Sequence, residues 1–161
     1  MTITRHGAAL GQVALGALWL GAAILATAVV APAAFAVLPT RTLAGDVVGR
    51  VLVVIFWSGI VVFAIAMVLG AWTDARSKYK PRVLAAALGG ASCMIAQLIV
   101  DAAIARVRAR INGPVDALAV IDPLRVAFGQ LHLVSVVLLG IAMLAAATVV
   151  VVALRGLRNP S

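Results

Sequence analysis

The chain has 161 residues, of which 65% are hydrophobic and 11% are charged. An ordinary soluble domain is about half apolar and about a quarter charged, and a chain of this length cannot wrap so much apolar surface in one small core. The composition therefore excludes an ordinary soluble domain. It indicates an all-α integral membrane protein whose main partner is the lipid bilayer.

The net charge is +8, from 13 Lys and Arg against five acidic residues. A basic excess can serve nucleic-acid binding, attraction to anionic lipid, or membrane topology. Here the basic residues lie between or beside apolar runs, with few aromatic residues among them. We interpret them as membrane-flanking anchors and expect no nucleic-acid partner.

Four apolar segments are long enough to cross a bilayer. A hydrocarbon core about 30 Å thick needs about 20 apolar residues in a helix. The segments predict a four-helix transmembrane bundle that forms a single domain over residues 1–161. We place its helices at about 10–38, 47–72, 83–105 and 126–154.

The first segment partly imitates a signal peptide, because Arg5 and His6 precede an apolar run and Ala34-Phe35-Ala36 resembles a cleavage site. The run from Leu10 to Val30 is longer than the usual signal core of about 7–15 residues. We therefore expect a retained helix. Pro32 lacks a backbone N–H and predicts a kink or an end of this helix.

The connections between the segments are polar. The short first connection, 40–46, makes the first two helices an antiparallel hairpin, and the charged second connection, 73–82, lies outside the hydrocarbon. Arginines alternate with apolar residues over 104–110, and we favour a helical extension there, because a lone strand beside lipid leaves backbone groups unpaired. Asp122 and Pro123 predict the cap and first residue of the fourth helix.

The distribution of Lys and Arg suggests an orientation. Seven lie on the side of the termini and the second connection, and six lie on the other side, three of them in the helical extension. Because Lys and Arg collect on the cytoplasmic side, we expect a multi-pass cell-membrane protein with both termini in the cytoplasm. Small residues spaced four apart predict tight packing within the bundle at Gly7 and Gly11, Gly45 and Gly49, and Ala86 and Gly90.

Polar and kink-forming residues gather on the side of the first and third connections. An ionisable group in hydrocarbon costs about 2.5–3.5 kcal/mol on insertion scales, so we expect Asp101 and His132 to face the bundle and have partners. Either Asp101 forms a structural ion pair, with Arg106 or with an adjacent helix, or it belongs to a proton or ligand site. The candidate binding pocket consists of Asp101, His132, Ser135, Gln97, Pro32 and Phe35.

Signals for metal, cofactor or enzyme chemistry are weak. His132 is able to bind a metal or haem, but the one other histidine, His6, lies on the opposite side by this sorting. Cys93 is the single cysteine, so we interpret it as a small buried helix residue. The sequence contains no phosphate-binding loop, nucleophile elbow or zinc-protease motif, so we expect no cofactor, no metal site and no enzyme.

Four short motifs stand out: LWLG at 18–21, APAAF at 31–35, AGDVVG at 44–49 and FGQLHLVS at 128–135. Together they resemble the transmembrane protein 205-like family, also described as domain of unknown function 4149, over Leu18 to about Leu139. The resemblance implies a four-helix membrane protein and no particular reaction. It maps the family elements onto Pro32, Phe35, Gly45, Gly49, Phe128, His132 and Ser135.

Three functional hypotheses follow. The first is a non-enzymatic membrane protein that binds or moves a small solute through the pocket around Asp101 and His132. The second is an accessory or assembly subunit of a larger membrane complex, because almost no sequence lies outside the helices. The third, a membrane anchor for haem or copper, rests on His132 alone.

Overall fold

The computed structural model describes residues 5–73 and 80–158, which fold into four long helical rods without a strand. The all-α prediction is confirmed. The first rod comprises α1 (Arg5–Leu25), the π-helical segment η1 (Ala26–Val30) and α2 (Ala31–Val37), and the second is α3 (Arg41–Thr73). The third comprises α4 (Lys80–Met94), the π-helical segment η2 (Ile95–Val100) and α5 (Asp101–Arg108). After the 3-10 turn η3 (Val115–Ala117), the fourth rod is α6 (Pro123–Arg158).

Each rod begins earlier than its predicted range, and all but the first end later. The apolar runs mark the part of a helix that lies in hydrocarbon, whereas backbone hydrogen bonding continues the helix into the headgroup region. The predicted extension of the third helix over 104–110 is confirmed as far as Arg108, where α5 ends, and residues 109–110 form a turn. The prediction for the second connection falls largely on residues 74–79, which lie outside the described part of the chain.

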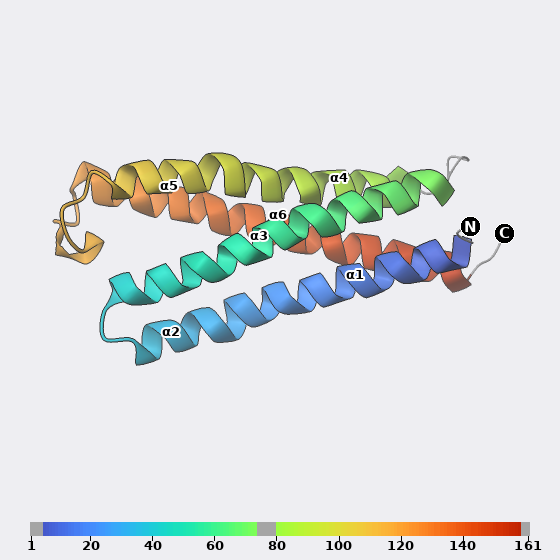
Figure 1. Ribbon diagram of the computed structural model, residues 1–161, viewed down its shortest axis with the longest axis horizontal. Helices are drawn as coiled ribbons and strands as arrows, with labels where there is room; N and C mark the ends of the chain where they lie inside the picture. Colours follow the sequence, from blue (N-terminus) through green and yellow to red (C-terminus); the bar gives the residue numbers. More distant parts are fainter. Residues whose placement is uncertain (1–4, 74–79, 159–161) are drawn as a thin grey trace.

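The rods form an up-and-down bundle. Both α1 and α4 pack against α3 and α6, so the order around the bundle is α1, α3, α4, α6. Figure 1 shows the start of α1 and the end of α6 at one end, and the α2–α3 and α5–α6 connections at the other. Consecutive rods therefore run antiparallel, as predicted for the first hairpin.

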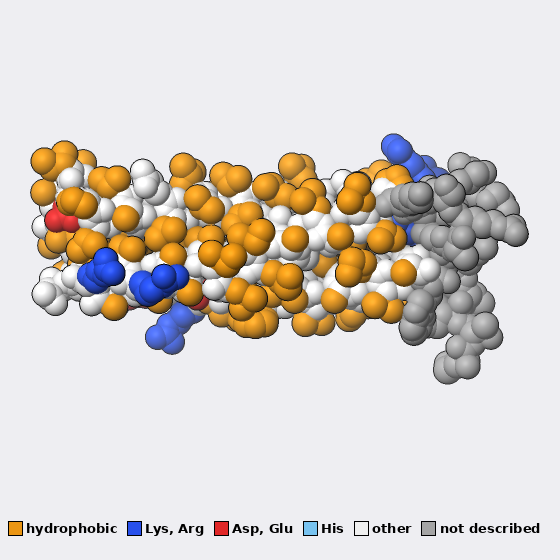
Figure 2. Space-filling model, turned by 90° about the horizontal axis from the view of Figure 1, so that it is seen from above, with side chains coloured by type: hydrophobic (Ala, Val, Ile, Leu, Met, Phe, Trp, Pro, Cys, Tyr) orange, Lys and Arg blue, Asp and Glu red, His pale blue; other side chains and the backbone are white. Residues whose placement is uncertain are grey.

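The outside of the bundle is apolar. Side chains such as Leu18, Leu84 and Leu144 are more than 70% exposed, whereas the interior is built largely from alanine and a few large side chains. Within the described residues, four stretches are long and apolar enough to cross a membrane: His6–Val37, Arg41–Ala71, Pro81–Arg108 and Pro123–Arg158. Figure 2 shows hydrophobic side chains over the middle of one face, and the visible Lys and Arg side chains towards its two ends.

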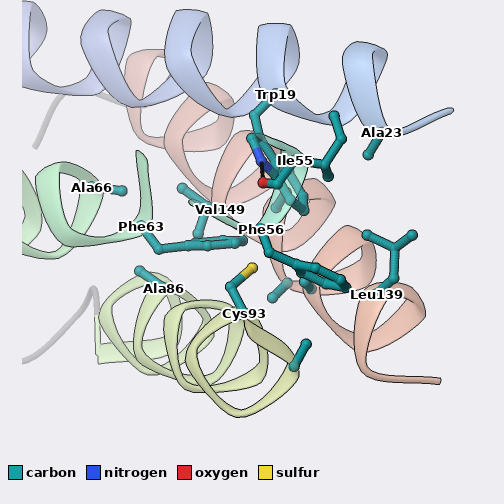
Figure 3. Packing of buried hydrophobic residues seen from close by; sticks show 14 of the residues in the cluster. Trp19, Ala23, Ile55, Phe56, Phe63, Ala66, Ala86, Cys93, Leu139 and Val149 are labelled. Atoms are coloured by element: carbon teal, nitrogen blue, oxygen red, sulfur yellow. Dashed lines mark hydrogen bonds between the residues drawn. The ribbon is translucent and has the colours of Figure 1, made fainter. Parts of the chain in front are cut away.

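The packed core lies around Trp19 and Phe63, whose rings meet edge to face with centroids 5.3 Å apart (Figure 3). The indole Nε1 of Trp19 donates a hydrogen bond of 2.9 Å to the Ile55 carbonyl oxygen of α3. Glycines on α3 and α4 make room for these rings. A Cβ on Gly59 would lie 3.0 Å from the Trp19 indole, and one on Gly89 would collide with the Phe63 ring.

The first rod passes through Pro32 without ending. Proline lacks the N–H that an α-helix needs, and its ring clashes with the carbonyl four residues earlier. The rod accommodates the proline with a wider π turn, in which the Ala31 N–H donates to the Ala26 carbonyl. The helix then continues to Val37. The alternative that Pro32 ends the helix is therefore wrong.

The start of the fourth rod agrees with its sequence signal. Helix α6 begins at Pro123, and the Asp122 carboxylate accepts a hydrogen bond of 2.8 Å from the Leu124 N–H. The preceding connection is tied to this helix by Arg125, whose guanidinium donates to the Leu118 carbonyl at 2.7 Å.

Candidate functional site

The bundle is tightly packed in its middle and loosens at the end that carries the first and third connections. Neither α2 nor α5 contains a buried residue. Helix α2 packs against α3 and helix α5 against α6, and Figure 1 shows the two hairpins diverging here. We call this region, formed by α2, residues 41–50 of α3, α5 and residues 123–135 of α6, the open end.

The glycine pair of α3 confirms the looseness of the open end. A Cβ on Gly45 or on Gly49 would meet no atom within 4 Å. The prediction that this pair packs tightly is therefore wrong, because no helix lies close enough to use the missing side chains. At Gly90, by contrast, a Cβ would lie 3.4 Å from Phe63, which is ordinary close packing.

His132 lies on the inward face of α6, one turn before the first buried residue of this helix. The buried residues of α6 begin at Ser135 and continue through Leu139 and Ala142. His132 precedes Ser135 by three residues and Leu139 by seven, which places it on the same helical face. It is nevertheless exposed, and no described residue hydrogen-bonds to it. The expectation that His132 has a partner is therefore not met among the described residues.

Gln97 and Asp101 form a linked pair on the third rod. Gln97 lies in η2 and is only 9% exposed, and its Nε2 donates to the Asp101 carboxylate at 3.3 Å. The other amide atom, Oε1, is buried and has no hydrogen-bond partner. Asp101 is exposed, so its carboxylate keeps further acceptor positions accessible. Asp101 thus has a partner as expected, but it does not face a closed bundle interior.

The predicted ion pair between Asp101 and Arg106 does not form. Arg106 turns its Nε to the Ala102 carbonyl on its own helix, at 3.1 Å. Arg108 instead pairs with Asp46 of α3 at 2.5 Å, which ties the α5–α6 hairpin to the α2–α3 hairpin. The long Arg108 side chain reaches this carboxylate although α5 itself packs against α6.

Four of the six predicted pocket residues share one layer at the inner edge of the open end. Counting about 1.5 Å per residue from the ends of α5 and α6, Asp101 and His132 lie about 10 and 14 Å into the bundle. Gln97 and Ser135 lie about 16 and 18 Å into it on the same two packed rods. These polar groups thus occupy a layer about 8 Å thick.

The other two predicted residues, Pro32 and Phe35, are not part of this group. Both are exposed, Phe35 by 52%, and both lie on α2, which packs against α3. Figure 1 shows α2 diverging from α5 and α6. Sharing one side of the membrane was therefore not sufficient to bring all six residues together.

Two polar features escaped prediction. One is the Asp46–Arg108 pair. The sequence feature that could have predicted it is that both charges lie on the same side of the membrane. The other is Gln12 in α1, which is 1% exposed and donates to the Ala66 carbonyl at 2.6 Å, while its Oε1 has no partner. An isolated glutamine within an apolar helix was the available signal for it.

Metal ligation by histidine has little geometric support within one chain. His6 lies in the first turn of α1, and His132 lies near the opposite end of the bundle. These two side chains therefore cannot ligate one ion together. No group of three or more His, Cys, Asp or Glu side chains in the described residues is placed to hold a metal ion.

The four apolar rods and the polar open end define a multi-pass membrane protein that resides in a lipid bilayer. A family model described as Domain of unknown function (DUF4149) matches residues 14–112, and the chain belongs to this family. The match includes Pro32, Gly45, Gln97 and Asp101 but ends before His132. The family roles of Phe128, His132 and Ser135, and the transmembrane protein 205-like name, therefore remain predictions. No curated protein and no solved structure matches the chain.

Proposed function

We propose that this protein is a non-enzymatic membrane protein that binds a small solute rich in hydrogen-bond donors, such as an ammonium or amine, at its open end. The observation that carries the proposal is the buried Oε1 of Gln97, which has no hydrogen-bond partner although the same side chain contacts Asp101. Two neighbouring acceptors, one neutral and one anionic, favour a ligand that supplies donors and positive charge.

The energetics support a ligand at this position. A buried acceptor without a partner costs about 1–3 kcal/mol, and a bound donor removes this cost. Asp101 is exposed, so a solute can reach its carboxylate directly, whereas contact with the buried Oε1 requires the Gln97 side chain to turn outwards. His132 and Ser135, in the same layer of α6, are able to contact its other side.

The test is a titration of the purified protein in lipid nanodiscs with methylammonium chloride, against sodium chloride at equal ionic strength. We expect methylammonium to raise the melting temperature of the wild type and to have no effect on Asp101→Asn or Gln97→Leu. Asp116→Asn is the matched control, because Asp116 is an exposed carboxylate on the third connection. A response of the wild type that Asp101→Asn retains would refute the proposed site.

We further propose that the protein lies in the cell membrane with both termini in the cytoplasm. The support is the excess of Lys and Arg on the side of the termini, seven against six. The open end then faces away from the cytoplasm, and the solute enters from that side. Uptake of radiolabelled methylamine into proteoliposomes, with Asp101→Asn as control, distinguishes transport from binding alone.

A second candidate is an accessory subunit of a larger membrane complex. Its specific support is the uncovered inward face of α6 at His132, which a helix of another protein is able to cover. Extraction of the tagged chain in mild detergent and mass spectrometry of the copurifying proteins tests this candidate. A stoichiometric partner lost in His132→Ala supports it, and recovery of the chain alone or as a homo-oligomer contradicts it.

A further inference from the structure

Arg50 is a charged residue without a partner on an apolar helix. It lies in α3 among Val47, Val48, Val51 and Leu52, and it is exposed. No residue of the described chain forms an ion pair or hydrogen bond with it. A guanidinium in this setting needs an anion or water, because an unpaired charge beside hydrocarbon is costly.

The length of α3 gives the depth of Arg50. The helix has 33 residues and is about 50 Å long, whereas the hydrocarbon core is about 30 Å thick. A centred helix therefore extends about 10 Å beyond the hydrocarbon at each end. Arg50 follows Arg41 by nine residues, or about 14 Å, so its Cα lies just inside the hydrocarbon. A long side chain at this depth reaches the level of lipid phosphates.

The acidic side chain one turn from Arg50 on α3 is already paired. Residues four apart lie on one face of a helix, so Arg50 shares the face of Asp46, which is held by Arg108 of α5. Arg50 therefore faces the side of α3 that is turned towards α5. Pairing with Arg108 neutralises the Asp46 carboxylate, the acidic group one turn from Arg50.

We infer that this face, formed by Arg50 beside the Asp46–Arg108 pair, binds the phosphate of an anionic phospholipid headgroup. The guanidinium fork of arginine matches phosphate oxygens in a bidentate geometry. The positive charge of Arg50 favours a headgroup of net negative charge over phosphatidylcholine, whose choline cation offsets its phosphate. The exposed apolar side chains of α3, such as Val54, which is 66% exposed, lie deeper and accommodate an acyl chain. This inference does not depend on solute binding at Gln97.

The test is native mass spectrometry of the full chain in detergent with equimolar phosphatidylglycerol and phosphatidylcholine. We expect the wild type to retain phosphatidylglycerol preferentially. Loss of one charge-assisted contact predicts about tenfold weaker binding in Arg50→Gln. Arg158→Gln, at the opposite end of α6, is the matched control and is expected to bind as the wild type does.

Folding and ligand identity are controlled separately. Arg50→Lys keeps the charge and is expected to retain the preference with an intermediate affinity. Equal binding of both lipids by the wild type, or full retention of phosphatidylglycerol by Arg50→Gln, overturns the inference. Displacement of phosphatidylglycerol by millimolar inorganic phosphate also overturns it, because the site then recognises a free anion rather than a lipid.

Discussion

Substitution of Gly89 by alanine tests the packing of the core most sharply. A Cβ at this position would lie 2.8 Å from Phe63 Cε2 and closer still to two other ring atoms, and real Cβ atoms essentially never approach within 3.0 Å. Phe63 is 2% exposed and its ring is held on another side by Trp19. The ring therefore cannot move away without disturbing a second helix contact.

The expected change in the free energy of unfolding of Gly89→Ala results from two opposed effects. Overpacking of a close-packed core costs about 1–3 kcal/mol, whereas replacing glycine by alanine inside a helix gains up to about 1 kcal/mol. We expect Gly89→Ala to lower the free energy of unfolding by about 1–2 kcal/mol. The assay is reversible unfolding in mixed micelles of dodecyl maltoside and increasing sodium dodecyl sulfate.

Two variants control this experiment. A Cβ on Gly21 would meet no atom within 4 Å, so Gly21→Ala isolates the gain in helix propensity. Adding Phe63→Leu to Gly89→Ala frees space, and the two substitutions are expected to couple favourably by about 1 kcal/mol. If Gly89→Ala is as stable as Gly21→Ala, the close approach of α3 and α4 described above is refuted.

Three further predictions use the same preparations. Trp19→Phe removes the 2.9 Å hydrogen bond to α3 and is expected to lower the unfolding free energy by about 1 kcal/mol; an unchanged value would show that the bond contributes nothing. Asp46→Asn and Arg108→Gln are each expected to lower the unfolding free energy by at most about 1 kcal/mol, because the native Asp46 and Arg108 side chains are 41% and 37% exposed and water screens their pairing. A loss of more than about 3 kcal/mol would contradict this screening. His132→Cys is expected to react with a water-soluble thiol reagent while Ser135→Cys, at a buried position, does not; the reverse order would contradict the open end.

The sequence was sufficient for the number of rods and their approximate positions, because transmembrane length and apolar content are properties of local sequence. It also identified the start of α6, since the Asp122 cap and Pro123 act within one turn. The effect of Pro32 was not predictable in the same way. Whether a proline ends a helix or is accommodated by a π turn depends on the surrounding packing, and here the rod continues.

The candidate site was predicted only in part for a similar reason. Helical spacing alone places Gln97 beside Asp101, and the structure confirms their contact. The partner of Arg108 depends on how α3 and α5 pack, so its pairing with Asp46 could not be read from the third rod by itself. The separation of α2 from α6 likewise results from the divergence of two hairpins, which apolar patterns do not encode.

The central structural claim is that four spanning helices place both termini on one side of the membrane and the open end on the other. Its most direct test is labelling of Ile121→Cys in intact cells with an impermeant maleimide, combined with antibody access to a C-terminal tag. Ile121 is 88% exposed, and the native Cys93 is fully buried and gives little background. We expect Ile121→Cys to react from outside while the tag becomes accessible only after permeabilisation. Access to both from the same side would contradict the claim, because α6 would then not cross the membrane.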